Sequence, residues 1–313
     1  SWFYVMVVVT VLLFTELKHT FTELAQRMKN DEMITLAKFL AISGIILPML
    51  PNENLIPDIN LTPYTIWLAT VVVSGISYLS YLLRRYVFQE SGILVSGIIG
   101  GLYSSTATIS VLARKSRKAP AQEAPEYAAA MLLAVSMMFL RFLILIGIFS
   151  KAILAAIYPY LLIMSLVTAG VAWFLHRKRQ PVSLTEGVAE EEDSSNPLEF
   201  KVALIFAVLF VIFTIVTHYT LLYTGTGGLN VLSFIAGLSD ITPFILNLLQ
   251  GSGVAVLVVT ACCMQAIVSN IAVNMCYALF FAGGRSPLRR WVLRGFGCVI
   301  AVNVCLLIFF YLL

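Results

Sequence analysis

The sequence has 313 residues, of which 60% are hydrophobic and 12% are charged, with a formal net charge of +4. So few charged residues cannot cover a soluble globule of this size, which excludes a water-soluble protein. The basic residues form short clusters without interleaved aromatic residues, which excludes nucleic acid as a partner. The apolar runs lack the alternation of barrel strands, so we expect an all-α polytopic helix bundle whose main partner is the lipid bilayer.

Apolar runs long enough to cross about 30 Å of hydrocarbon at about 1.5 Å per residue recur along the whole chain. The first begins at Ser1 without an initiator Met, so the segment 1–61 is expected to be the remnant of a longer upstream membrane portion. The runs predict about eight full spans, which cover 1–15, 34–50, 64–87, 128–149, 153–175, 200–222, 254–281 and 291–313.

Two further apolar stretches, 92–113 and 228–249, are rich in Gly or hydroxyl residues and are interrupted by polar residues at their middle. Lys and Arg collect on cytoplasmic loops, and this bias can decide between crossing and dipping. If 92–113 crossed the bilayer, Arg84 and Arg85 would lie opposite the basic run 114–118. If both stretches are re-entrant, the basic clusters are all cytoplasmic and Lys151 lies outside, which is the arrangement we expect.

The two stretches also align with each other at an offset of 136 residues (237 − 101), which carries the neighbouring spans onto one another. We expect an internal repeat with a first unit over 62–179 and a second over 198–313, joined by a cytoplasmic linker over 180–197. The charge-derived topology makes the second unit inverted, an organisation typical of transporters and some channels. The motif tips 104–108 (SSTAT) and 239–242 (SDIT) would then meet near the middle of the bilayer.

Asp240 is the only acidic residue after Glu199, and an unpaired carboxylate is costly in hydrocarbon. Two interpretations stay open: Asp240 binds a cation as a metal ligand or carries a proton, or it caps a half-helix by accepting backbone N–H groups. The hydroxyl groups of the two tips offer the oxygen ligands that hard cations prefer, with local capping and close helix packing as the alternative. These hydroxyl residues are Ser104, Ser105, Thr106, Thr108 and Thr242.

Three other polar residues lie inside predicted spans. Arg141 is a candidate counter-ion for Asp240 or an anion contact, with snorkelling to a membrane interface as the alternative. Asn270 and Asn274 are four residues apart on one helical face and either line the same interior or bond between helices. No nucleophile–base pair and no phosphate-binding motif is present, so we expect neither an enzyme nor a cofactor.

At GGLYSSTATISVLA (100–113) and GLSDITPFILNLL (237–249) the sequence resembles the C-terminal membrane domain of the longer MgtC/SapB-like bacterial membrane proteins. The resemblance runs from the turn at 47–51 to Gly284. It departs from the family pattern at Thr242, where the family often has a second acid, and at Asn274, near which the family has a Lys. The resemblance implies a bacterial inner membrane and a component of magnesium transport.

The functional expectation is a transporter or channel that passes a small ion through a site between the two re-entrant motifs. A divalent cation such as Mg²⁺ is the expected substrate. The alternative is a non-transporting regulatory or scaffold subunit that binds a partner membrane protein. In either case the expected protein partner is a second copy of this chain or another membrane protein.

Overall fold

The computed structural model describes residues 30–56, 59, 61–83, 92–178, 200–250, 254–284 and 286–312. The expected span over 1–15, the Arg84–Arg85 pair and the expected linker over 180–197 lie outside these ranges. The chain divides into two compact units, Ser1–Met49 and Leu50–Leu313. In the first unit the helix α2 (Asn30–Met49) coincides with the expected span over 34–50.

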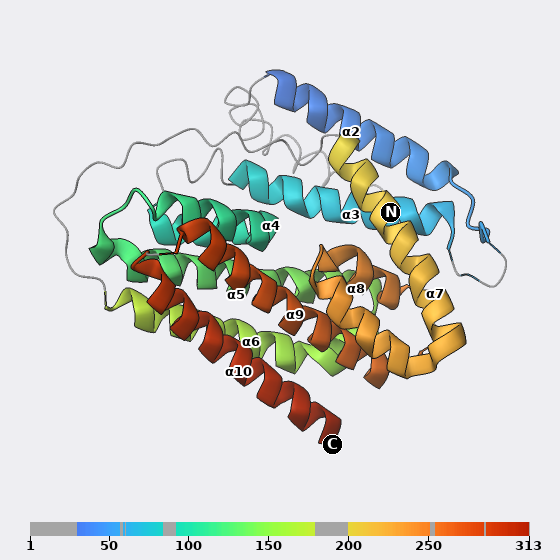
Figure 1. Ribbon diagram of the computed structural model, residues 1–313. Coiled ribbons are helices and arrows are strands. Elements are labelled where there is room, and N and C mark those ends of the chain that lie inside the picture. Colours follow the sequence, from blue (N-terminus) through green and yellow to red (C-terminus); the bar gives the residue numbers. More distant parts are fainter. Residues whose placement is uncertain are drawn as a thin grey trace, which may run out of the picture. The chain divides into compact units, whose positions relative to one another are not determined.

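The described part of the second unit is helical apart from an isolated bridge between Ile56 and Ile59, which confirms the all-α prediction (Figure 1). Seven helices among the described residues are long and apolar enough to cross a membrane, so the protein is a multi-pass membrane protein. The seven include α4, over the stretch expected to be re-entrant, and do not include α2. The elements of this unit are α3 (Pro63–Leu82), α4 (Ile93–Lys115), the short 3₁₀ helix η2 (Ala121–Glu123), α5 (Ala124–Phe149), α6 (Lys151–His176), α7 (Phe200–Gly237), α8 (Ile241–Leu249), α9 (Val256–Ala282) and α10 (Leu288–Leu312).

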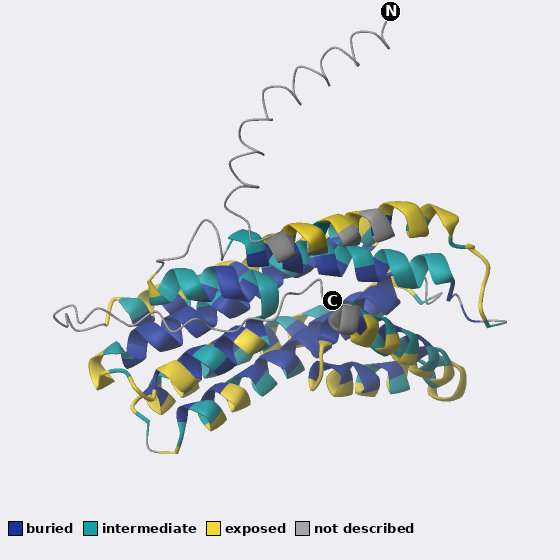
Figure 2. Cartoon of the chain, turned by 90° about the horizontal axis from the view of Figure 1, so that it is seen from above, coloured by how far each residue is buried: buried dark blue, intermediate teal, exposed yellow. Residues whose placement is uncertain are grey.

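Large apolar side chains cover the outward faces of several helices in this unit. Leu166 on α6 exposes 72% of its surface, Leu222 on α7 64% and Phe309 on α10 60%. Buried residues lie between the helices instead (Figure 2). An apolar surface of this extent is unfavourable in water and is the surface that a membrane protein presents to lipid.

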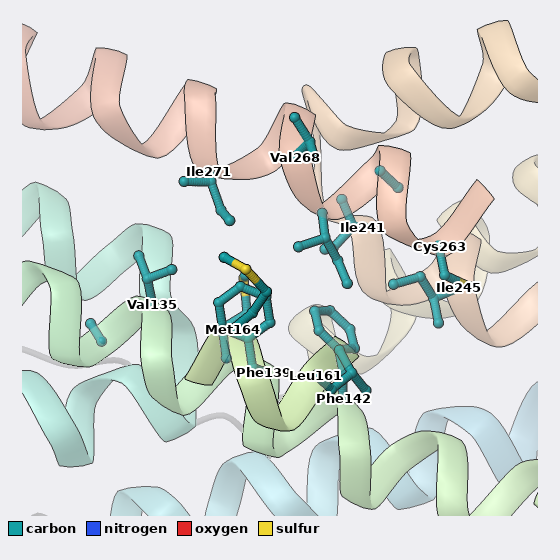
Figure 3. Close-up of a cluster of buried hydrophobic side chains, with 14 of the residues drawn as sticks. Val135, Phe139, Phe142, Leu161, Met164, Ile241, Ile245, Cys263, Val268 and Ile271 are labelled. Atoms are coloured by element: carbon teal, nitrogen blue, oxygen red, sulfur yellow. The ribbon is translucent and has the colours of Figure 1, made fainter. Parts of the chain in front are cut away.

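The core of the unit gathers around α5 and α9. Figure 3 shows Val135 and Phe139 of α5 near Met164 of α6, with Ile241 at the start of α8 and Ile271 of α9 completing the cluster. Small residues on α5 allow other helices to approach its backbone closely. Those that are fully buried are Ala128, Ala129, Ala130 and Ala134.

The helix α4 is broken at Ser104, where the backbone is extended (φ −157°, ψ 111°) between two helical halves. Gly100 lies directly against the Thr108 side chain across this break. A Cβ atom added at Gly100 would collide with the Oγ1 and Cγ2 atoms of Thr108. In a continuous helix these residues would lie about 12 Å apart. The two halves of α4 therefore fold back on each other.

The first half of α4 runs in the same direction as α5. Gly97 packs against the backbone of Ala130, and Gly101 packs against the backbone of Ala134 one turn further along both helices. Neither glycine has room for a Cβ atom. The second half of α4 therefore runs opposite to α5, which lets a short connection lead from Lys115 into α5.

The helix α7 also turns back on itself, at Gly225 (φ 63°, ψ −154°), a conformation that glycine adopts without steric cost (Figure 1). Beyond this turn Gly228 lies against the Thr220 side chain, eight residues earlier in the sequence. The second half of α7 runs in the same direction as α9, since Ser233 Oγ donates to Gln265 Oε1 (2.6 Å) and Gly237 packs against Ser269.

After α7 the chain breaks at 238–240, and α8 returns alongside the first half of α7. The rings of Phe213 and Phe244 lie 5.6 Å apart, and Asn247 Nδ2 donates to Thr217 Oγ1 (2.9 Å). The second half of α7 and α8 therefore form a second fold-back segment, which corresponds to the motif over 228–249.

The two fold-back segments open toward opposite ends of α9. The end of the first segment adjoins the C-terminal end of α9, where Arg117 Nη2 donates to the Phe280 carbonyl (3.2 Å). The second segment ends at Leu249, shortly before α9 begins. The helices α6 and α10, which come after α5 and α9 in the chain, are also antiparallel, because Tyr160 Oη donates to Asn303 Oδ1 (2.6 Å) and Leu175 contacts Gly295.

Candidate functional site

A cavity of about 480 Å³ lies where the breaks of the two fold-back segments meet. Its wall is formed by α3, α4, α5, α7 and α9 together with the residues around the second break. The structure brings the two polar motifs together, as the sequence predicts, and their role as ion ligands stays a prediction. The predicted site residues that line the cavity are Ser104, Ser105, Thr106, Arg141, Asp240, Thr242 and Asn270.

Two predicted site residues do not line the cavity. Thr108 is buried against Gly100 and joins the two halves of α4. Asn274 is fully buried, and its Nδ2 atom donates to Asn270 Oδ1 (3.1 Å). Both therefore support the walls rather than face the interior.

Several lining residues were missed by the sequence analysis. Ser74 and Ser77 of α3 face the cavity, and their three-residue spacing in an apolar span is a signal that they share one helical face. Tyr277 of α9 also lines it and stands 136 residues after Arg141, at the repeat offset (277 − 141). Applying that offset to Arg141 would have found Tyr277.

Ser104 begins the second half of α4, which leads back from the break and which we call the returning half; α8 is its counterpart at the second break. Its Oγ atom accepts the Ala107 N–H group (3.3 Å), the contact of an N-cap residue. Ser105 and Thr106 follow in the first turn of that half and face the cavity. For Ser104 the capping interpretation is confirmed, and the cap also fixes where the half-helix begins.

Asp240 occupies the same place at the second break, 136 residues after Ser104. Its Oδ1 atom accepts the Thr242 N–H group (2.9 Å), so it caps α8. The side chain is nevertheless exposed at the cavity. The capping interpretation is therefore confirmed, and the carboxylate also places a negative charge at the cavity wall.

The Arg141 side chain points to the first break. Its Nη1 atom donates to the Tyr103 carbonyl (2.7 Å), the last carbonyl before the break. We call the half-helix that leads to a break, which is the first half of α4 or the second half of α7, the inward half. Its Nε atom is buried and has no hydrogen-bond acceptor. Asp240 lines the same cavity, and its role as the counter-ion of Arg141 stays a prediction.

Asn270 performs at the second break the task that Arg141 performs at the first. Its Nδ2 atom lies 3.3 Å from the Gly237 carbonyl and 3.4 Å from the Ser239 carbonyl, which end the inward half of α7. Donors from α5 and α9 thus hold the carbonyl ends of both inward halves. Carbonyl groups left without hydrogen-bond donors inside an apolar helix bundle would be costly.

The cavity combines one cation, one anion and several hydroxyl groups inside an apolar helix bundle. Among the residues that the structure describes, no group of three or more His, Cys, Asp or Glu side chains could hold a metal ion. The predicted role of Asp240 as a metal ligand stays a prediction.

A family model described as a domain of unknown function, DUF4010, matches residues 71–282, a range that contains every residue lining the cavity. No curated protein and no solved structure matches the chain. The family match contains no link to the MgtC/SapB-like proteins, so that resemblance stays a prediction.

Proposed function

The chain belongs to the DUF4010 family, and because its description assigns no function, we propose from the cavity itself that this protein passes a small ion across a membrane. The ion would move through the cavity between the two breaks. The observation that carries the proposal is the meeting of both breaks at Arg141 and Asp240. Charged side chains inside a membrane bundle are costly and usually belong to a path for a hydrophilic solute.

The same proposal includes the membrane arrangement: both fold-back segments are re-entrant, and the repeat units 62–179 and 198–313 are inverted relative to each other. Two contacts at equivalent positions of the repeat units support it. Gly101 packs against Ala134, and at the offset of 136 Gly237 contacts Asn270. Half-helices that end near the midplane are the usual binding device of inverted-repeat transporters.

The positions of the basic residues support one orientation. Arg117 adjoins the end of α9, and Leu175 at the end of α6 adjoins Gly295 at the start of α10. The basic residues near these helix ends therefore face one side, whereas Lys151 starts α6 at the other. By the positive-inside rule the first side is cytoplasmic, in keeping with the expected bacterial inner membrane.

The sequence predicts a divalent cation as the substrate, and Asp240 would be the only carboxylate ligand for it from the cavity wall. Hydroxyl groups of Ser105, Thr106 and Thr242 would have to supply the remaining oxygen ligands. Arg141 would repel such a cation from the same cavity.

Flux measurements in liposomes with a bulky side chain in the cavity test transport independently of the ion. We expect native protein to conduct at least one small ion above empty liposomes, and Ser239→Trp to abolish this flux by filling the cavity. Leu222→Trp places the same side chain on an exposed position of α7 and should conduct like the native protein.

Equal flux in both tryptophan variants would contradict a path through this cavity. Native protein that conducts no ion above empty liposomes would contradict transport and would favour the regulatory or scaffold alternative.

A further inference from the structure

We propose that the ion held between the two breaks is a small anion, bound by the Arg141 guanidinium and by the first turns of the two returning half-helices. This inference rests on the proposed function and names its substrate class. It rests on the balance of hydrogen-bond donors and acceptors around the cavity.

The guanidinium of Arg141 has more donors than its protein partners use. Nη1 holds the Tyr103 carbonyl, and Nε has no acceptor although it is buried. A buried donor without a partner is costly, and an acceptor bound nearby offsets that cost. Guanidinium groups bind planar oxyanions particularly well, through paired N–H groups.

Both returning half-helices begin at the cavity, one after Ser104 and the other after Asp240. The first N–H groups of a helix have no intrahelical acceptor, and the helix dipole adds a partial positive charge. The caps take up the N–H groups of Ala107 and Thr242, which leaves others of these first turns for a ligand.

Several acceptors that a cation could use at the two breaks are already engaged. Arg141 holds the Tyr103 carbonyl, and Asn270 holds the Gly237 and Ser239 carbonyls. Asp240 uses one carboxylate oxygen as a cap. Its carboxylate lines the same cavity as Arg141 and would keep an anion from binding too tightly to leave.

The test measures salt efflux from phosphatidylethanolamine–phosphatidylglycerol liposomes that contain the full chain. Separate samples are loaded with potassium nitrate, formate or chloride, and valinomycin provides a path for potassium. Potassium then leaves only as fast as an anion accompanies it. A parallel sample reports Mg²⁺ entry with an enclosed fluorescent indicator.

We expect anion efflux from the native chain and a decrease of about tenfold or more for Arg141→Gln, since a charged hydrogen-bond partner is lost. Asp240→Asn should conduct the anion at least as fast as the native chain, because Asn keeps the cap and removes the repelling charge. The control Arg290→Gln removes an exposed positive charge outside the cavity and should leave efflux unchanged.

Mg²⁺ entry without anion efflux, or loss of flux in Asp240→Asn but not in Arg141→Gln, would overturn the anion assignment while leaving transport in place. Absence of every flux would overturn transport itself, and the anion assignment with it.

A binding measurement keeps the proposal testable if Arg141→Gln does not fold. The melting temperature of the purified native chain should rise in nitrate or formate relative to gluconate at equal ionic strength. No rise in any of these anions would also count against the proposal.

Discussion

Two small polar residues determine where the half-helices begin. Ser104 and Asp240 each accept a backbone N–H group of the following turn, a contact that contributes about 0.5–2 kcal/mol. The two breaks therefore have similar geometry. They differ in charge, because Ser104 is neutral and Asp240 carries a carboxylate. The carboxylate of Asp240 and the guanidinium of Arg141 make the cavity suited to a charged solute.

The glycine residues at the contact of α4 with α5 are as important as the polar ones. A Cβ atom at Gly97 would collide with Ala130, and one at Gly101 would collide with Ala134. In both cases the obstacle is backbone, which cannot rotate away. Glycine at these two positions therefore allows the inward half of α4 to lie against α5.

We predict that Gly101→Val destabilises the protein by about 1–3 kcal/mol or more, because the added methyl groups overpack the contact with Ala134. The measurement is the apparent melting temperature in detergent, followed by size-exclusion chromatography. Gly170→Val on α6 is the control, since a Cβ atom there meets no atom within 4 Å. Equal melting temperatures for the two variants would show that α4 and α5 do not pack as described.

At the scale of elements, each fold-back segment is held by the helix that follows it. The inward half of α4 packs along α5, and the inward half of α7 packs along α9. Arg141 on α5 and Asn270 on α9 then hold the carbonyl ends of these halves. A broken segment thus obtains from its neighbour the hydrogen bonds that a continuous helix would make internally.

The fold-back of α4 predicts a disulfide that a continuous helix forbids. The Cβ atom of a side chain at Gly100 would lie 3.3 Å from Thr108 Cβ, close to the separation found in disulfides. We expect Gly100→Cys combined with Thr108→Cys to cross-link under mild oxidation, as read by loss of maleimide labelling. The double variant is made in a background without the five native cysteines, of which Cys276, Cys298 and Cys305 are exposed.

A matched pair on a continuous helix serves as the control. Val304→Cys and Leu312→Cys are also eight residues apart, on α10, and should stay reduced. A disulfide within each molecule of the control, or none in the α4 pair, would argue against the fold-back.

Hydropathy and charge predict most of these elements. The expected spans over 64–87, 128–149 and 153–175 coincide with α3, α5 and α6, because long apolar runs have few alternatives in a membrane. The clustering of Ser104 and Asp240 at one cavity was also predicted, from their places at the middle of two similar motifs.

Other features depend on details that hydropathy does not carry. Length and composition alone count α4 as a membrane-crossing helix, since one extended residue, Ser104, barely changes them. Asn274 shares a helical face with Asn270, but it bonds to Asn270 instead of facing the cavity. Ser74 and Ser77 were missed because isolated Ser residues are common in membrane helices.

At the scale of the whole molecule, the two fold-back segments meet at one polar cavity, and exposed apolar side chains lie on the outward faces of the surrounding helices. The antiparallel pairing of α6 with α10 and the opposite openings of the fold-back segments are in keeping with the inverted repeat that we propose.

The most direct test is the side of the membrane reached by the ends of both fold-back segments. Single cysteines at Gly92 and Lys118 flank the first segment, and single cysteines at Gly227 and Val254 flank the second. In cells labelled with a membrane-impermeant maleimide, we predict that the first pair is protected as cytoplasmic and the second pair reacts from outside. Gly92→Cys and Lys118→Cys on opposite sides would mean that α4 crosses the bilayer, and would contradict the account.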